Sequence, residues 1–533
     1  MSVWMQLLMA AVLAAGIWMG RTFLGDPESR GGSGEKLGTI FRLIDEEYVD
    51  RVDVDSLVEL TIPDLLTKLD PHTVYISASE LADVNSELEG SFSGVGVSFS
   101  IINDTITVVE VLSGGPAEKV GLLAGDRIVA VDDSIVAGNG VTNQQVFRLL
   151  RGEKDTRVKL GISRSTSPKI LDYTLTRGDI AVNSVDASYM LADNVGYVKV
   201  NKFGRTTYDE FLTSLLMLRN SGAETFVVDL RGNGGGFMDR AILMVNEFLD
   251  AGKPIVLTKG RDGIVEQSAY SDGHGSFRDK KVVVLIDEFS ASASEIFAGA
   301  LQDNDRGLII GRRSFGKGLV QRQIELPDSS AVRLTVSRYY TPSGRCIQKD
   351  YVPGHADNYS NEILERYNHG EAFTADSISF NEDLRFITST GRTVYGGGGI
   401  MPDIFVPTDT TCYTGYYINV VNAGLLQKFA FQYADRNRDR FDGCNDAGEV
   451  LDRLPGDDAL LQSFVAYAAQ NGIPARWYYI NISKPLLVNQ LKALIARDLL
   501  GSAAYYEISN RRDATVNQAL MAVERGDADF PLR

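Results

Sequence analysis

The chain has 533 residues, of which 44% are hydrophobic and 23% charged, and its formal net charge is −17. One hydrophobic core does not extend over this length, so several domains are expected. The acidic charge excludes nucleic acid as a partner, because phosphate binding needs a basic surface. Three cysteines without C-x-x-C spacing and four scattered histidines argue against a zinc site.

The N-terminus carries an apolar segment over residues 3–19, broken only by Gln6 and followed by Arg21. Its length suits either a short membrane span or the apolar part of a signal peptide. We therefore expect a signal peptide or a membrane anchor over residues 1–25 and a linker over 26–34. Both alternatives predict export to the periplasm or cell envelope, with membrane contact through residues 3–19 if the anchor is retained.

The next two regions differ in the spacing of their apolar residues. Helical periodicity over 37–48 and 54–69 predicts an N-terminal helical region, 35–85, whose second helix stops at Asp70-Pro71. Short apolar alternations broken by glycine then predict a β-rich binding domain over 86–180. Its expected strands lie at 97–99, 105–111, 125–131 and 157–162, and the last of them closes the domain. A helix is expected at 144–150.

Residues 181–410 alternate between strand and helix patterns, which predicts a largely parallel sheet with helices packed on it. The strands are expected at 195–200, 225–230, 281–287 and 308–311, and the helices at 208–220, 239–249 and 293–302. The region 411–533 is predicted to be helical, with helices at 425–433, 459–471, 485–499 and 516–525. The expected fold class is thus α/β and multidomain.

Two strand-end loops carry the candidate chemistry, because catalytic groups gather at the carboxyl ends of parallel strands. The turn 289–295 places serines at a helix start, where free N–H groups stabilise negative charge. The glycine run 231–236 follows Leu230 and allows close approach of the backbone. Together the two loops predict an oxyanion hole with one N–H from each.

A nucleophilic serine also needs a base. The sequence has no G-x-S-x-G string, and no histidine lies in a strand-end loop, so Lys317, flanked by glycines, is the best candidate. Ser314 and Lys317 form an S-x-x-K string, but that pairing needs a helix, which Gly316 and Gly318 disfavour. The alternative pairs Lys317 with a serine at 290–294. Either way the lysine must lose roughly 3 pKa units through burial to act at neutral pH.

Six long strings stand out in the chain: LDPHTVYIS (69–77), DLRGNGGG (229–236), SASASEIFAGALQD (290–303), GRRSFGKGLVQ (311–321), YYTPSGRCIQ (339–348) and GGGGIMPD (396–403). Together with the Gly-Val-Gly turn at 94–96, these strings resemble the C-terminal processing peptidase (tail-specific protease) family over residues 37–405. The resemblance implies a ClpP/crotonase-like α/β protease core with an inserted PDZ domain.

The resemblance also implies roles for individual residues. The nucleophile would be Ser292, with helix capping as the plain alternative for one of the three serines. The remaining implied residues are Lys317 as base, Gln321 as its orienting group, Ala293 and Gly235 as oxyanion donors, Val95, Gly96 and Val97 as the carboxylate-binding turn of the PDZ domain, and Arg151 as a link between PDZ binding and activation.

These roles predict a serine endopeptidase that needs no metal and no cofactor. Its expected partners are protein or peptide substrates with free, apolar C-termini, held by the PDZ domain as an added strand. A catalytically silent PDZ adaptor of the envelope is the alternative, and a homo-oligomer is compatible with both. One alternative in the tail stays open: Cys412 and Cys444 form a disulfide or remain free thiols. Residues 435–439 resemble the start of a calcium loop, but Arg440 stands where that loop needs glycine, so no calcium site is expected.

Overall fold

The computed structural model describes residues 33–529 except for 103, 113, 124, 165 and 166. The expected signal or anchor over 1–25, and the linker up to residue 32, lie outside these residues. Within the part of the chain that is described, no helix combines the length and the apolarity that a bilayer crossing needs.

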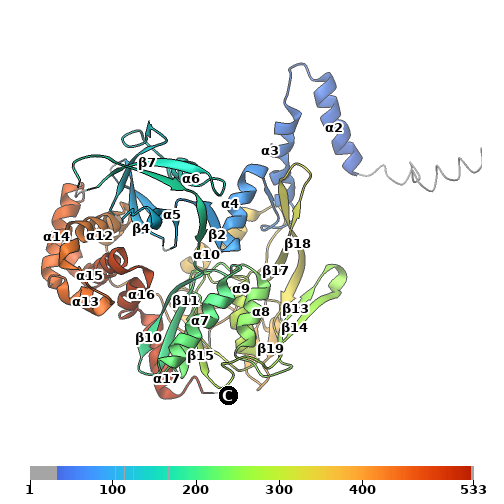
Figure 1. The fold of residues 1–533 in the computed structure, drawn as a ribbon. Helices are drawn as coiled ribbons and strands as arrows, with labels where there is room; N and C mark the ends of the chain where they lie inside the picture. The colour runs from blue at the N-terminus through green and yellow to red at the C-terminus, as the bar shows by residue number, and fades with distance from the viewer. Residues whose placement is uncertain (1–32, 103, 113, 124, 165–166, 530–533) are drawn as a thin grey trace, which may run out of the picture.

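A six-stranded sheet forms the centre of the molecule (Figure 1). In spatial order its strands are β10 (Val185–Ala192), β11 (Val195–Val200), β12 (Thr225–Asp229), β15 (Lys281–Ile286), β16 (Leu308–Gly311) and β21 (Ile404–Phe405). All neighbours run parallel except β10, which pairs antiparallel with β11. The largely parallel sheet expected from the sequence is confirmed.

Both faces of this sheet are covered, which explains why β12 reads as an uninterrupted buried run. Alternate residues point to opposite faces: Phe226 and Val228 pack under the helices of one face, and Val227 packs on the other. The first face carries α7 (Thr207–Asn220), α8 (Met238–Asn246) and α9 (Ala293–Asp303). The second face carries α17 (Ala514–Arg525), so the end of the chain completes the protease core.

A second sheet stands beside the first and includes a strand from the N-terminal region. It contains β1 (Val74–Ile76), β18 (Ala331–Tyr340), β13 (Pro254–Lys259) and β14 (Val265–Tyr270) in that order, with β17 (Leu319–Glu325) also paired to β18. The region 35–85, expected to be helical, therefore also contributes a strand. Its helices are α2 (Ser33–Glu47), α3 (Val54–Thr67) and α4 (Ala78–Glu89), of which α2 and α3 project from the body (Figure 1).

The β-rich domain follows and contains a five-strand path with a sixth strand attached. The path is β3 (Val97–Ile102), β4 (Thr105–Val111), β5 (Arg127–Val131), β7 (Arg157–Ser163) and β8 (Leu171–Thr176), with β6 (Ser134–Ile135) beside β5 and with helices α5 (Pro116–Lys119) and α6 (Asn143–Leu150). The expectation that 157–162 closes the domain is wrong, because β8 pairs with β7 over six residues. A separate pair, β2 (Ser91–Gly94) and β9 (Gly178–Ala181), connects the domain to the protease core.

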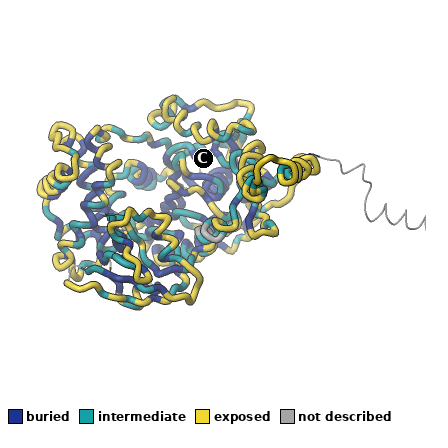
Figure 2. The backbone as a smooth tube through the Cα atoms, turned by 90° about the horizontal axis from the view of Figure 1, so that it is seen from above, coloured by how far each residue is buried: buried dark blue, intermediate teal, exposed yellow. Residues whose placement is uncertain are grey.

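The C-terminal region is helical, as expected, and builds its own apolar core from α11 (Gly415–Asn422) to α16 (Ser502–Asn510). Along the described backbone, buried segments lie mostly inside the molecule and exposed ones at its periphery (Figure 2). The helices between them are α12 (Leu425–Arg436), α13 (Ala447–Arg453), α14 (Asp457–Gln470) and α15 (Trp477–Leu500). Helix α15 begins earlier than the sequence suggested and contains Pro485 in its interior. Cys346, Cys412 and Cys444 are free thiols, so the open Cys412–Cys444 disulfide is not formed.

Candidate active site

Three neighbouring strands of the central sheet end at the same place. Strand β12 leads into the glycine run 231–236, β15 into the turn 287–292, and β16 into the loop 312–318 that carries Lys317. Because β12, β15 and β16 are parallel neighbours, their carboxyl ends bring these three loops together. Residues 313–318 are not helical, so the S-x-x-K pairing of Ser314 with Lys317 is not formed.

The three serines of the turn differ in what their hydroxyls do. Ser290 Oγ donates to Leu230 O at 2.9 Å, Ser294 Oγ donates to Asn233 O at 2.9 Å, and both residues are fully buried. Ser292, in contrast, lines the cleft described below. Ser290 and Ser294 therefore fasten the turn to the glycine run, and Ser292 alone of the three presents its side chain to the cleft.

Ser292 also has an unusual backbone. Its φ of 55° and ψ of −112° lie outside the common regions for a side-chain-bearing residue, a state that costs about 1–3 kcal/mol and clusters at functional sites. The residue stands at the N-terminus of α9, where the Ala293 N–H has no acceptor among the described residues. This N–H belongs to the first turn of the helix, whose donors have no partner four residues back within the helix.

The glycine run packs directly on this turn. A Cβ at Gly235, where φ is 102°, would lie 2.8 Å from Ser292 Cβ and 3.0 Å from Ala293 N, so only glycine fits. The Gly235 N–H donates to Asn233 Oδ1 at 2.9 Å, whereas the N–H groups of Gly234 and Gly236 have no acceptor within the described chain. The Gly235 N–H, which the sequence predicted as an oxyanion donor, is thus occupied by Asn233 in this structure.

Lys317 projects into the same cleft from the neighbouring loop. Its Nζ donates to Gln321 Oε1 at 3.1 Å, and Gln321 Nε2 donates in turn to His72 O at 2.6 Å. Burial, followed by the positive charge of Arg333, holds the pKa of Lys317 below its usual value against the opposing charges of Glu295 and Asp70. Ser292 and Lys317 line one cleft without a direct Oγ–Nζ hydrogen bond in this conformation.

The loop 70–73 supports this arrangement from the N-terminal region. Asp70 accepts hydrogen bonds from the backbone N–H groups of His72 and Thr73 at 2.8 and 2.9 Å, which fixes the His72 carbonyl against Gln321. Burial and the charge of Lys317 lower the pKa of His72 to about 4, so its ring is neutral at pH 7. Its Nε2 is 2.9 Å from the hydroxyl of Tyr359.

Glu295 joins the serine turn to the lysine loop and was assigned no role from the sequence. The carboxyl group is fully buried and accepts four hydrogen bonds: from Ser292 N and Lys317 N on Oε2, both at 2.8 Å, and from Ser314 Oγ and Gly316 N on Oε1, at 2.5 and 2.7 Å. Burial raises its pKa to about 7, although the four donors oppose this. The S-x-x-E spacing of Ser292 and Glu295 matches a capping box and is the signal that predicts part of this contact.

Tyr339 makes a second bridge between the same two loops. Its buried hydroxyl lies within hydrogen-bond distance of two carbonyl oxygens, Ser292 O at 3.0 Å and Lys317 O, and its single proton is available to either. The cleft bounded by these groups has a volume of about 610 Å³. It is lined by Ser292, Lys317 and Gln321, by the glycines 234–236, by Asn85 and Glu89 of α4, and by Arg205, Gln323, Glu325 and Arg333. The arrangement suits attack by a serine on an extended polypeptide.

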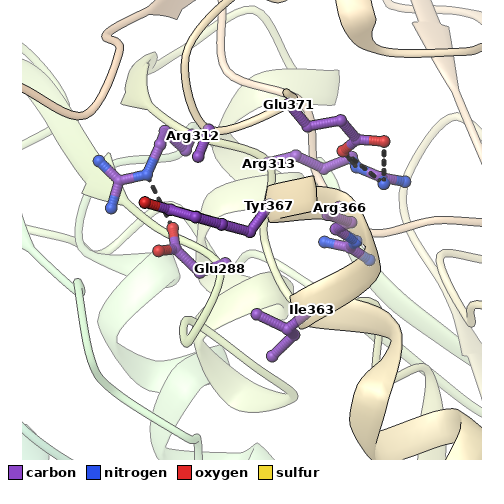
Figure 3. A pocket seen from close by; sticks show the side chains of 8 residues that line it. Glu288, Arg312, Arg313, Ile363, Arg366, Tyr367 and Glu371 are labelled. Atoms are coloured by element: carbon purple, nitrogen blue, oxygen red, sulfur yellow. Dashed lines mark hydrogen bonds and ion pairs between the residues drawn. The ribbon is translucent and has the colours of Figure 1, made fainter. Parts of the chain in front are cut away.

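A smaller pocket of about 50 Å³ lies behind the lysine loop (Figure 3). Its arginines are already engaged: Arg312 pairs with Glu288, and Arg313 with Glu371. Arg366 donates to the carbonyls of Ser314 and Phe315 at 2.7 and 3.0 Å. Helix α10 (Ala356–Asn368), which carries Arg366, therefore holds the backbone of the lysine loop in place.

The residues expected to bind a substrate C-terminus lie in the β-rich domain, and none of them lines the cleft. Val95 O and Gly96 O accept backbone hydrogen bonds from Ala117 and Leu112, and Gly96 has a φ of 83°. Val97 begins β3, the edge strand of its sheet. The Arg151 guanidinium lies 4.7 Å from the ring centres of both Phe92 and Phe147, at the connection to the protease core.

Comparisons with known proteins agree with this architecture. A family model described as Peptidase family S41 matches residues 194–357, a PDZ domain model matches 93–175, and a family of unknown function (DUF8443) matches 416–501. The carboxy-terminal-processing protease of Bartonella bacilliformis is 37% identical over 318 residues, which cover 59% of this chain and 72% of that protein. This chain belongs to the carboxy-terminal-processing protease family.

Further similar proteins match either the same part of the chain or the PDZ domain alone. A probable CtpA-like serine protease of Staphylococcus aureus is 33% identical over 314 residues, 58% of this chain and 62% of that protein. Among solved structures, the photosystem II D1 C-terminal processing protease is 31% identical, covers 59% of this chain and 90% of its own, and has a TM-score of 0.33. A peptide-bound PDZ domain of a Vibrio cholerae carboxy-terminal protease is 28% identical over 17% of this chain and 99% of its own, with a TM-score of 0.16. The C-terminal processing protease described here is thus a serine-type peptidase with a PDZ domain and an added helical region.

Proposed function

We propose that this C-terminal processing protease is an endopeptidase that uses Ser292 as nucleophile and Lys317 as general base. The observation that carries the proposal is the cleft, which is lined by both Ser292 and a lysine with a lowered pKa. Neutral Lys317 takes the Ser292 proton, and the alkoxide attacks the peptide carbonyl. Gln321 holds the lysine through its Oε1.

The oxyanion formed in this step would be stabilised by backbone N–H groups. The Ala293 N–H and one N–H of the 234–236 run are the proposed donors, with Gly235 serving if its N–H leaves Asn233. Lys317 then protonates the leaving amine, and water hydrolyses the acyl-enzyme.

We further propose that the PDZ domain selects substrates by a free, apolar C-terminus. Strand β3 is an edge strand, so an extended peptide can pair with it, and the turn of Val95, Gly96 and Val97 would hold the terminal carboxylate. The apolar segment 3–19 supports export, so the proposed substrates are envelope proteins and the proposed location is the periplasm, with residues 3–19 as an anchor if they are retained. A homo-oligomer or an activating adaptor is compatible with this scheme.

A degradation assay tests the proposal on protein lacking residues 1–30. The substrate is a loosely folded protein that ends in a free apolar tail, and parallel substrates carry a charged or an amidated tail. Wild type is expected to cleave, with Ser292→Ala and Lys317→Ala inactive and Lys154→Ala, a surface pair with Asp179, unaffected. Cleavage by Ser292→Ala would refute the assignment. Wild type that binds tails but cleaves none would favour the adaptor.

A further inference from the structure

One charged side chain of the helical region after residue 410 contacts the start of the glycine run in the catalytic core. Asp513 is the N-cap of α17, where its Oδ1 accepts from the Val516 N–H at 2.9 Å. The same carboxylate accepts two hydrogen bonds from Arg231 Nη1, at 3.0 and 2.8 Å. Asp513 lies outside the residues matched by the three family models, and Arg231 opens the glycine run of the proposed site.

Arg231 transmits this contact to a fully buried carboxylate. Its Nε and Nη2 donate to Asp229 over 2.6–3.1 Å, and its backbone N–H donates to Asp229 Oδ1 at 2.9 Å. Asp229 also accepts from the Tyr197 hydroxyl at 2.8 Å and lies 3.5 Å from Lys199 Nζ, which donates to Arg231 O. A network of charged groups therefore fixes the start of the glycine run, and Asp513 is its outermost member.

The glycine run is in turn joined to the serine turn. Asn233 O accepts from Ala291 N at 3.0 Å and from Ser294 Oγ at 2.9 Å, and the Asn233 side chain holds Val200 O and the Gly235 N–H. A displacement of Arg231 therefore moves the backbone that lies against Ser292. Asp513 is 27% exposed and Arg231 18%, so this ion pair is partly shielded from water, unlike a surface pair.

We propose that Asp513 is a positioning residue of the active site, so that the C-terminal helix α17 sets the geometry of the oxyanion loop through Arg231. This inference rests on the proposed role of the 234–236 run. Oxyanion donors act only when they lie at hydrogen-bond distance from the developing charge, and small misplacements are costly. Loss of the Asp513 charge is therefore expected to lower kcat by about 10- to 100-fold and to leave KM unchanged.

The clean perturbation is Asp513→Asn, because asparagine caps a helix as well as aspartate does while the charge is lost. The matched control is Asp446→Asn: Asp446 is also an exposed aspartate N-cap in the helical region, where it accepts from Glu449 N at 2.9 Å. Asp513→Glu keeps the carboxylate and is expected to recover part of kcat. The measurements are kcat and KM on a chromogenic peptide, the rate of Ser292 labelling by a fluorophosphonate, and Tm.

The expected result is a low kcat and slow labelling in Asp513→Asn, at unchanged KM and Tm, with Asp446→Asn like wild type. Either of two results would overturn the inference: kcat within twofold of wild type, or a kcat loss that appears only together with a fall in Tm and is not recovered by Asp513→Glu. Ser292→Ala runs alongside, and labelling that persists in it would defeat the proposed function itself, independently of Asp513.

Discussion

The exchange Glu295→Gln tests the connection between the two catalytic loops most directly. At pH 8, above its pKa of about 7, the carboxyl group is ionised and its two oxygens accept four hydrogen bonds. A glutamine offers one carbonyl oxygen, so two of the four donors lose their acceptor and face an NH₂ group instead. A buried donor without an acceptor costs about 1–3 kcal/mol, so the free energy of unfolding should fall by about 2–6 kcal/mol.

Activity should fall further than stability alone explains. Glu295 Oε2 holds the backbone N–H groups of both Ser292 and Lys317, so its loss changes the separation of the proposed nucleophile and base. Displacements near 1 Å cost on the order of 100-fold in rate. Urea denaturation and fluorophosphonate labelling under native conditions measure the two effects separately.

The control is Glu247→Gln. Glu247 is a buried glutamate of the same core that accepts from Tyr208 Oη and Ser276 N, both at 2.8 Å, and does not line the cleft. It is expected to lose stability with normal labelling of the folded protein. A Glu295→Gln variant that unfolds and labels like wild type would refute the reasoning, as would two variants that lose labelling equally.

Three further predictions concern the base, the glycine run and the PDZ connection. Arg333→Gln removes a positive charge that lowers the pKa of Lys317, so the acidic limb of the pH profile of kcat/KM should move to higher pH. Arg338→Gln is the control, and an Arg333→Gln profile that coincides with the profile of this control would contradict the prediction. Gly235→Ala places a Cβ 2.8 Å from Ser292 Cβ at a φ of 102° and should lower kcat about 100-fold. Gly234→Ala, whose Cβ meets no atom within 4 Å and whose φ is not positive, should retain most of the activity; equal rates in a peptidase assay would count against the packing argument. Arg151→Ala removes the guanidinium between Phe92 and Phe147 and should reduce the ratio of cleavage rates between apolar-tailed and charged-tailed substrates. Cleavage of a short peptide without a tail should not change. An unchanged ratio would show that Arg151 does not link the PDZ domain to cleavage.

The sequence by itself determined the pattern of elements in the protease core. Buried apolar runs such as 225–229 and 281–286 carry the strand signal in every residue, and parallel strand ends must share one edge of the sheet. This pattern pointed to Lys317 as base but left the serine open between Ser314 and the serines of 290–294; only the resemblance of the SASAS and GKG strings to the C-terminal processing peptidase family named Ser292. The capping-box spacing of Ser292 and Glu295 was equally visible there, although only one of the four contacts of Glu295 follows from it.

Only the tertiary structure decided which groups meet across long separations in the chain. Strand β1 pairs with β18 over a separation of more than 250 residues, and Asp513 meets Arg231 across 282 residues; no local periodicity encodes either contact. The same holds for the serines: in the chain Ser290, Ser292 and Ser294 are equivalent, and the packing of the glycine run buries two hydroxyls and leaves the third in the cleft. Local sequence sets backbone preference and burial pattern, whereas the partners of a buried polar group depend on which loops the complete fold brings together.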